Sequence, residues 1–476
     1  MPLLTSLMRC TPAVVDGADD TPKHLGWIMM TALGIGATIG AGIFAMPGII
    51  AGKAGPAGIL SFLITGFVIA MVAVCYDQFS RRVTNGVSAY SYVYHSLGEL
   101  AAWVVAFGLF LEYSFGSSAV SIAWAEYLKT SLGYTLPPFF AGPTNGPDGF
   151  HFGVNIVAVA VVLVVTLILC FGGVSKSAKL NFVLVCLKMG LLIMFLCVGA
   201  SHVNPANWTP FMPMGWEGVL KGAAIAVFPY VGFDALFTFA RESKSLKDTR
   251  LATVLCVGIV AFLYVTVMAV ATGLAPCMIP DAAHPGQLMA NPLFGGNDAA
   301  APLAKLLANA GENWTSKFIA AGAVLGIFNV LLVLCMGGPR IFRNMAEDGL
   351  LPEIFQKTNK GNPVVGIALN GLIVALTAGL VPFGDIADMM VLGTLVAFMF
   401  VGFGALKLKL VNPVVALLAS VGCIILMGHL GKLVLQVYCV TLPVGLLIYF
   451  TYSRHHSKLG KAQAAAAKPE DLIPSA

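Results

Sequence analysis

Three ionisable residues lie inside long apolar runs of this sequence: Glu112, Lys188 and Asp234. A charged side chain at bilayer depth costs free energy, and it usually marks a ligand site or an ion pathway. Lys188 is the most informative, because an ammonium group has three donors and no acceptor. Within FVLVCLKMGLLIMF it needs backbone carbonyls or a carboxylate as partners. The alternative, that the three residues only pair with one another or with the backbone to hold helices together, stays open.

A glycine-rich stretch, GIGATIGAGIFAMPG at 34–48, has three interpretations. A phosphate-binding loop needs a strand before the glycines and a helix after them, whereas this stretch has apolar flanks and lacks the GxGxxG spacing. Gly36 and Gly40 form a GxxxG pair that can seat a neighbouring helix. The third interpretation, a membrane helix that unwinds near Gly40-Ala41-Gly42, is favoured because glycine accepts non-helical backbone at low cost.

An unwound segment inside a membrane is tolerable only where its backbone groups line a cavity. Its free N–H groups and the positive end of the following half-helix would hold a carboxylate, and its free carbonyls a cation. A zwitterion fits such a site. Carbonyls of a broken helix also bind Na⁺ in sodium-driven transporters, so a lysine fixed there would make sodium redundant. Because burial disfavours a charged amine, Lys188 can also gain and lose a proton. These properties predict proton coupling, or exchange, without sodium.

The elements that position these residues are membrane helices. Of the 476 residues, 58% are hydrophobic and 10% are charged, against about 25% charged in a soluble domain. The apolar runs do not alternate in polarity as barrel strands do, and they reach the roughly 20 residues of a spanning helix. We therefore predict an all-α membrane protein with twelve transmembrane helices, near 27–50, 57–79, 97–128, 152–171, 180–200, 218–240, 250–274, 317–340, 364–381, 386–406, 411–428 and 433–452.

The basic residues predict topology. The net charge of +5 does not indicate a nucleic-acid partner, since the placement of the lysines and arginines accounts for it. With both termini in the cytoplasm, most basic residues between the spans fall on that side, as the positive-inside rule requires for an even number of spans. We expect a multi-pass protein in the lipid bilayer of the plasma membrane, or of the inner membrane in a Gram-negative cell.

The first and sixth spans share a mid-helix interruption. The second interruption is FPYVGFDALF at 228–237, five helices after the first. Two interrupted spans at corresponding places indicate an inverted-repeat transporter with its site at the breaks. The expected organisation is a cytoplasmic tail (1–26), a first five-helix repeat (27–200), a second (218–406), helices 11 and 12 (411–452) and a cytoplasmic tail (453–476).

The sequence indicates neither an enzyme nor a resident cofactor. The ten cysteines are scattered singly, a distribution that suits apolar packing better than a disulfide or a metal site. The spans hold no Ser/His/Asp or HExxH set for an enzyme and no charged ring for a channel. No metal and no cofactor are therefore expected, and a proton is the expected coupling ion.

At these residues the sequence resembles the amino acid–polyamine–organocation superfamily, and within it the cationic amino acid transporter subfamily with its bacterial members. The matching blocks occur in the family order over nearly the whole membrane region. They are GIGATIGAGIF, AGPAG (54–58), YDQFSRRVTNGVSAYSYVYHSLGE (76–99), LEYSFG (111–116), the lysine of span five, YVGFDA (230–235) and GGPRIFRNMAEDGLLP (337–352). The resemblance implies a leucine-transporter-like 5+5 inverted repeat with broken helices 1 and 6.

The resemblance also assigns site residues. It implies that the substrate carboxylate lies on the amides of Ala41 and Gly42, beside Gly40. The amino group would lie on carbonyls near Ile39 and the second break at Val231. Phe228 would close over the site as an aromatic gate. Lys188 takes the sodium position, with Glu112 and Asp234 as buried acids, and Arg340 belongs to the cytoplasmic gate. A positive-inside anchor is the alternative role for Arg340.

The expected function is a secondary-active amino-acid permease that is sodium-independent and proton-coupled. The alternative is an antiporter that exchanges one amino acid for another or for a polyamine. Ile327, early in span eight, is expected to face the pocket as a bulky apolar residue. This favours small or medium neutral L-amino acids, because a methylene in a pocket discriminates by about 1–3 kcal/mol. Arginine or lysine as substrate stays open, with Asp234 or Glu112 as the side-chain partner.

Overall fold

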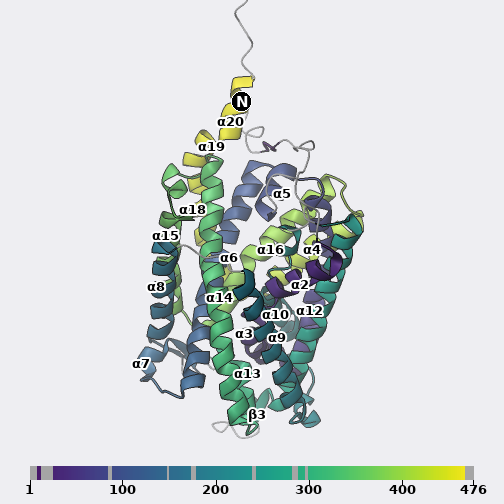
Figure 1. Cartoon of the computed structure of the whole chain (residues 1–476), viewed down its shortest axis with the longest axis vertical. Helices are drawn as coiled ribbons and strands as arrows, with labels where there is room; N and C mark the ends of the chain where they lie inside the picture. The colour runs from purple at the N-terminus through teal and green to yellow at the C-terminus, as the bar shows by residue number, and fades with distance from the viewer. Residues whose placement is uncertain are drawn as a thin grey trace, which may run out of the picture.

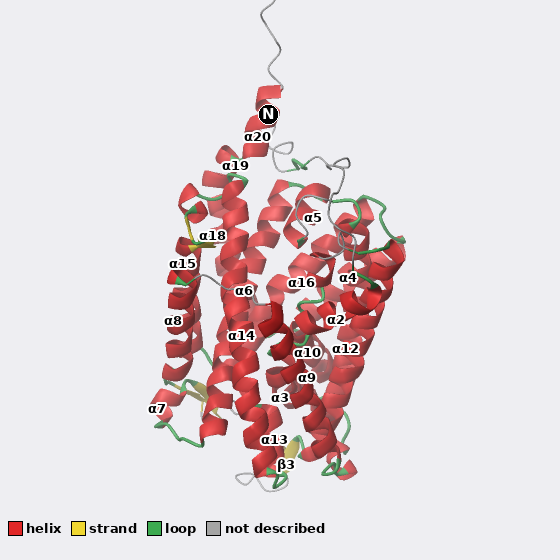
Figure 2. Cartoon of the chain, in the orientation of Figure 1, coloured by secondary structure: helices red, strands yellow, loops and turns green. Residues whose placement is uncertain are grey.

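Long helices that run roughly side by side form nearly the whole molecule (Figure 1). The computed structural model describes residues 8–11, 25–83, 88–146, 149–172, 178–238, 243–280, 288–294 and 299–466. Strands are confined to short pieces in the connections, as Figure 2 shows. They form three antiparallel pairs: β1 (Thr144–Gly146) with β2 (Gly149–His151), β3 (Met278–Pro280) with β4 (Leu288–Ala290), and β5 (Thr358–Asn359) with β6 (Asn362–Pro363).

The described α-helices follow one another along the chain with connections of unequal length. They are α2 (Trp27–Thr38), α3 (Gly42–Ala54), α4 (Gly58–Ser80), α5 (Ala89–Ser96), α6 (Glu99–Leu132), α7 (Pro138–Ala141), α8 (Ile156–Phe171), α9 (Ala178–Ala200), α10 (Gly215–Tyr230), α11 (Ala235–Thr238), α12 (Leu246–Leu274), α13 (Pro302–Asn309), α14 (Asn313–Glu347), α15 (Val364–Leu380), α16 (Phe383–Lys407), α17 (Pro413–Met427), α18 (Lys432–Ile448), α19 (Arg454–His456) and α20 (Lys458–Ala466). Single helical turns at Gly55–Ala57, Pro205–Trp208, Pro292–Phe294, Glu353–Gln356 and Tyr449–Ser453 join some of them.

Within the described residues, seven helical segments are long and apolar enough to cross a membrane. They are Gly42–Ser80, Glu99–Leu132, Val183–Ala200, Lys247–Leu274, Asn313–Glu347, Phe383–Lys407 and Lys432–His456. Four shorter apolar helices accompany them: Trp27–Thr38, Ile156–Phe171, Val364–Leu380 and Pro413–Met427. The expectation of an all-α membrane protein is therefore confirmed, and every span expected from the sequence overlaps a helix or a pair of helices.

The helices pack in two groups. In one group, α10 and α12 pack against α2, α3 and α4; in the other, α14 and α15 pack against α6 and α8. α16 joins the groups, since it packs against α6, α4 and α10. Its crossing with α6 is close: a Cβ on Gly393 would lie 2.1 Å from the carbonyl oxygen of Gly108, so only glycine fits there. Small residues allow this approach of two membrane helices.

The two ends of the bundle carry different elements (Figure 1). One end, called the α5 end, carries α5, α19 and α20. The described residues 8–11 also lie there, because Thr11 O is 2.7 Å from His95 Nδ1 and a Cβ on Gly460 would meet the Arg9 guanidinium. The opposite end, called the α13 end, carries α7, α13 and β3. Both ends of the described chain are thus on one side of the bundle.

Candidate functional site

A cavity of about 570 Å³ lies among the two helix groups and reaches toward the α5 end. Its walls come from the 36–42 segment, the 228–234 segment, α6, α14 and α16, and Lys188 of α9 contributes to it. Toward the α5 end it is lined by Tyr90 of α5 and by Arg340 and Asn344 of α14. The two interrupted helices therefore meet at one space, although they are nearly 200 residues apart in the chain.

The first break separates α2 from α3. α2 ends at Thr38, Ile39 has a non-helical ψ of 84°, and α3 begins at Gly42. Among the described residues, the N–H groups of Ala41, Gly42 and Ile43 donate to no backbone carbonyl. These donors stand at the N-terminus of a 13-residue helix, where the helix dipole favours negative charge. The break thus presents a ready site for a carboxylate at the cavity wall.

The second break separates α10 from α11 and lies against the first. α10 ends at Tyr230, and Gly232 has a φ of +111°, which disfavours other residues. A Cβ on Gly232 would also lie 2.6 Å from Ala37 O, and one on Gly42 would lie 2.7 Å from Pro229 Cα. Glycine is therefore required on both sides, because the two breaks touch backbone to backbone.

Lys188 reaches the first break from α9. Its Nζ donates to Ile39 O at 2.7 Å, and the residue is 4% exposed. Its aliphatic stem covers α14, since a Cβ on Gly326 would lie 2.9 Å from Lys188 Cγ. The expected partner of the ammonium, a backbone carbonyl freed by a broken helix, is thus the one found. Within the described residues Lys188 forms no ion pair with a carboxylate.

Glu112 and Asp234 line the same cavity from α6 and from the second break. Glu112 is 5% exposed, and its Oε2 is buried without a hydrogen-bond partner among the described residues. Thr394 of α16 contacts its other side as a hydrogen-bonding neighbour. The structure therefore does not pair Glu112 with Lys188, and it leaves one carboxyl oxygen available to a proton or a ligand.

The remaining sequence-predicted residues divide into two sets. Phe228, Val231 and Arg340 line the cavity together with Gly40, Ala41 and Gly42. Ile327 does not: it is 1% exposed and lies one turn closer to the start of α14, next to the turn that the Lys188 stem covers. The expectation for Ile327 is thus corrected. The α14 residues that line the cavity are Asn329, Val330, Val333 and Leu334.

Several lining residues were not expected from the sequence: Tyr76, Tyr113, Thr394 and Phe398. Tyr76 and Tyr113 belong to YDQFS and LEYSFG, two of the blocks that carry the family resemblance. Nothing about the two tyrosines themselves predicted a place at the cavity. Thr394 and Phe398 belong to α16 and had no such signal.

One polar contact at the α5 end connects the cavity rim to α14. The Tyr90 hydroxyl donates to Asp348 Oδ2, just after the last residue of α14. Burial raises the pKa of the Asp348 carboxyl above its ordinary value, and the hydrogen bond from Tyr90 opposes that rise. The pKa of the Tyr90 phenol is also raised by burial.

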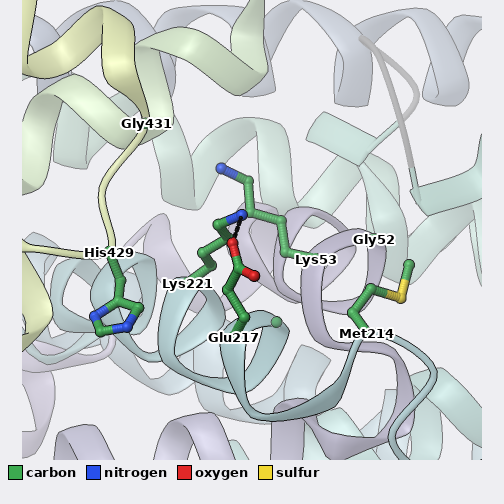
Figure 3. Close-up of a pocket in the computed structure, with 8 residues that line it drawn as sticks. Gly52, Lys53, Met214, Glu217, Lys221, His429 and Gly431 are labelled. Carbon is green, nitrogen blue, oxygen red and sulfur yellow. Dashed lines mark hydrogen bonds and ion pairs between the residues drawn. The ribbon is translucent and has the colours of Figure 1, made fainter.

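A second pocket, of about 540 Å³, lies at the α13 end (Figure 3). Lys53, Lys221, Glu217 and His429 line it. Figure 3 shows the ion pair between Glu217 and Lys221, which measures 2.6 Å. Lys53 pairs outside the set drawn, with Asp388 of α16 at 2.7 Å. Both lysines of this pocket are thus paired with carboxylates.

Comparison with known proteins gives a consistent result. The profile of a family described as "Amino acid permease" matches residues 25–452. The chain is 34% identical over 467 residues to the branched-chain amino acid permease BcaP of Bacillus subtilis (strain 168), covering 94% of this chain and 97% of that protein. It is 32% identical over 481 residues to a methylthioribose transporter of the same organism, covering 96% and 100%. It is 28% identical over 493 residues to cationic amino acid transporter 4 of Mus musculus, covering 99% and 68%.

Proposed function

Because this chain belongs to the amino acid permease family, we propose that it carries amino acids by a sodium-independent, proton-coupled mechanism through the cavity between its two broken helices. The observation that carries the proposal is the 2.7 Å contact between Lys188 Nζ and Ile39 O. This contact gives the freed carbonyl a cation that is tethered to the protein, at the kind of site where sodium-driven transporters bind Na⁺.

The substrate's α-carboxylate binds the free N–H groups of Ala41, Gly42 and Ile43. The dipole of α3 adds to these donors. The α-amino group binds carbonyls of the two breaks, near Ile39 and Val231. Phe228 lies over this position: a Cβ on Gly116 of α6 would be 3.4 Å from Phe228 Cε2. In this proposal the ring closes between the substrate and the opposite wall.

The proton couples to transport through Lys188 and the two acids of the cavity wall, Glu112 and Asp234. Lys188 and Glu112 are buried, and burial disfavours their charged forms, so protonation and conformation are linked. The buried Oε2 of Glu112, which has no hydrogen-bond partner among the described residues, supports this role. No sodium ion is required, since the Lys188 ammonium already binds the Ile39 carbonyl that would otherwise be free for a cation.

The proposed architecture is a leucine-transporter-like 5+5 inverted repeat of twelve transmembrane helices. The packing supports it: α2–α4 pack against α10 and α12, and α6 and α8 pack against α14 and α15. The first two spans of each repeat thus associate, and so do the third and fourth. We place the α5 end, with both termini and Arg340, in the cytoplasm, and the protein in the plasma membrane.

Neutral amino acids of small or medium size are the proposed substrates. Beside the backbone groups, the cavity walls include the apolar side chains of Val330, Val333, Leu334 and Phe398. The Bacillus subtilis relative is named a branched-chain amino acid permease, which agrees with an apolar site for the substrate side chain. Relatives named as cationic amino acid transporters support a second candidate, a cationic amino acid whose basic side chain binds Glu112 or Asp234.

Uptake of a labelled amino-acid panel into proteoliposomes tests the proposal. Three conditions are compared: an imposed pH gradient, an imposed sodium gradient, and unlabelled amino acid inside without either gradient. We expect accumulation of neutral amino acids that follows the pH gradient alone. A requirement for sodium would contradict the role given to Lys188. Uptake that occurs only with internal amino acid would replace symport by exchange.

A further inference from the structure

A tyrosine of α12 joins the two helix breaks. Tyr264 is fully buried, and its hydroxyl lies 2.7 Å from Pro229 O and 3.2 Å from Thr38 O. Thr38 is the last residue of α2 and Pro229 lies in the last turn of α10. Both carbonyls belong to final turns, whose oxygens lose their helical partners where a helix stops. A single side chain thus serves backbone groups of both broken helices.

The Tyr264 ring is held in place by aromatic neighbours. It packs against Tyr230 of α10 with ring centroids 5.1 Å apart, and against Phe62 of α4 at 5.5 Å. The Tyr230 hydroxyl in turn donates to Phe62 O at 3.0 Å. This cluster fixes the direction of the Tyr264 C–O bond, so the hydroxyl cannot leave the two carbonyls without a movement of α12.

The position of the breaks relative to each other matters for an amino acid. In the proposed function, which this inference extends, the carboxylate binds N–H groups of the first break and the amino group also uses the second. A rigid zwitterion gains both contacts only when the breaks keep a fixed spacing. Tyr264 is absent from the residues that line the cavity, so it acts on the substrate through the backbone.

We propose that Tyr264 is a positioning residue: its hydroxyl holds the backbone of 38–42 and of 228–232 at the spacing that lets one amino acid contact both breaks. Its proton is shared between Pro229 O, the nearer acceptor, and Thr38 O. Loss of the hydroxyl leaves Pro229 O without that donor and leaves Thr38 O with the Gly40 N–H, which belongs to the first break itself, so the two breaks can separate.

The test is Tyr264→Phe, with Tyr449→Phe as the matched control. Both variants delete one fully buried hydroxyl, but Tyr449 donates to Glu99 Oε1 of α6, which belongs to neither break. We expect similar losses of thermal stability. Only Tyr264→Phe should raise the KM for the best amino acid, by roughly three- to tenfold, as expected for one lost hydrogen bond.

A competition assay separates positioning from a general loss of stability. The 2-hydroxy acid analogue of the substrate keeps the carboxylate and lacks the ammonium group, so it depends less on the spacing of the breaks. In Tyr264→Phe the ratio of the inhibition constants of hydroxy acid and amino acid should fall by the factor by which KM rises. An unchanged ratio, or a KM within about twofold of Tyr449→Phe, overturns the proposal.

The outcomes are distinguishable from failure of the proposed function, since in that case the wild-type protein itself takes up no amino acid. If Tyr264→Phe does not purify as a folded protein, Phe62→Leu replaces it. That variant loosens the seat of Tyr264 and keeps the hydroxyl. A higher KM with a lower competition ratio supports the proposal, and wild-type values for both overturn it.

Discussion

Lys53 Nζ lies 2.7 Å from Asp388 Oδ2 and 2.8 Å from Oδ1, which joins the end of α3 to the first turns of α16. The side chains are 28% and 10% exposed, so water screens this pair only in part. It lies at the α13 end, whereas the central cavity reaches toward Tyr90 and Arg340 at the α5 end. The ion pair therefore holds the bundle together on the side away from the cavity's opening.

Asp388→Asn should slow transport because it leaves the Lys53 ammonium partly buried beside a neutral group. Breaking such a pair costs more than breaking an exposed one, and we expect roughly tenfold slower uptake with KM nearly unchanged. Glu217→Gln is the control, because it breaks an exposed pair at the same end, which water screens almost completely. Equal uptake rates in the two variants would show that the Lys53–Asp388 pair has no part in the cycle.

Lys188→Ala should abolish proton-driven uptake while the protein still inserts and purifies. The alanine leaves Ile39 O without its ammonium donor and removes the charge from the cavity. Lys317→Ala, which removes an exposed lysine near the start of α14, should behave as wild type. The measurement is uptake into proteoliposomes under a pH gradient. Substantial uptake by Lys188→Ala would refute the coupling role of this residue.

Gly42→Ala should damage substrate binding. The new Cβ would lie 2.7 Å from Pro229 Cα, so the two breaks must separate. Overpacking of this kind costs about 1–3 kcal/mol, which corresponds to a loss of about five- to 150-fold in Vmax/KM. Gly190→Ala in α9 is the matched control, because its Cβ meets nothing within 4 Å. Comparable transport by the two alanine variants would exclude a tight contact between the breaks.

The sequence predicted the features that depend on local backbone chemistry. The glycines at 40 and 42 and the YVGFDA block marked both breaks, because glycine is what a non-helical segment requires. Lys188 predicted a backbone carbonyl or a carboxylate as its partner, because a buried ammonium needs an acceptor. In each case the residue type alone restricts the environment, and the structure has the environment that the type requires.

Features that depend on tertiary distance could not be predicted. Ile327 was expected at the cavity, but the sequence does not reveal where along α14 the cavity ends, and one turn was enough to move it out. Tyr264 looked like any aromatic residue of an apolar span, since its role arises from carbonyls 35 and 226 positions away. In the sequence, Lys53 looked like an ordinary lysine at the end of a span. Its pairing with Asp388 depends on the position of α16, which the sequence does not reveal.

Asp348→Asn should change how stability depends on pH. Burial raises the pKa of the Asp348 carboxyl in the folded protein, so its neutral form is favoured there. For such a group, stability is highest below the unfolded-state pKa of about 3.9 and falls as the pH rises through the folded pKa. The asparagine has no charge to bury and can still accept from Tyr90. We expect the melting temperature of the variant, relative to that of wild type, to rise as the pH increases over this window. A difference in melting temperature that is the same at all pH values would contradict the assignment.

Val330→Ala should relax selectivity toward larger neutral amino acids. Val330 lines the cavity next to the first break, with its methyl groups 3.8 Å from where a Cβ on Gly40 would stand. Removing them enlarges the space for the substrate side chain, and a pocket methylene is worth about 1–3 kcal/mol, so the ratio of Vmax/KM for leucine and alanine should shift by about tenfold. Ile327→Val removes one methylene from the residue that does not line the cavity, and this ratio should stay as in wild type. The two variants decide between the position expected from the sequence and the one in the structure: a shift in Ile327→Val with none in Val330→Ala would place the substrate side chain one turn closer to the start of α14.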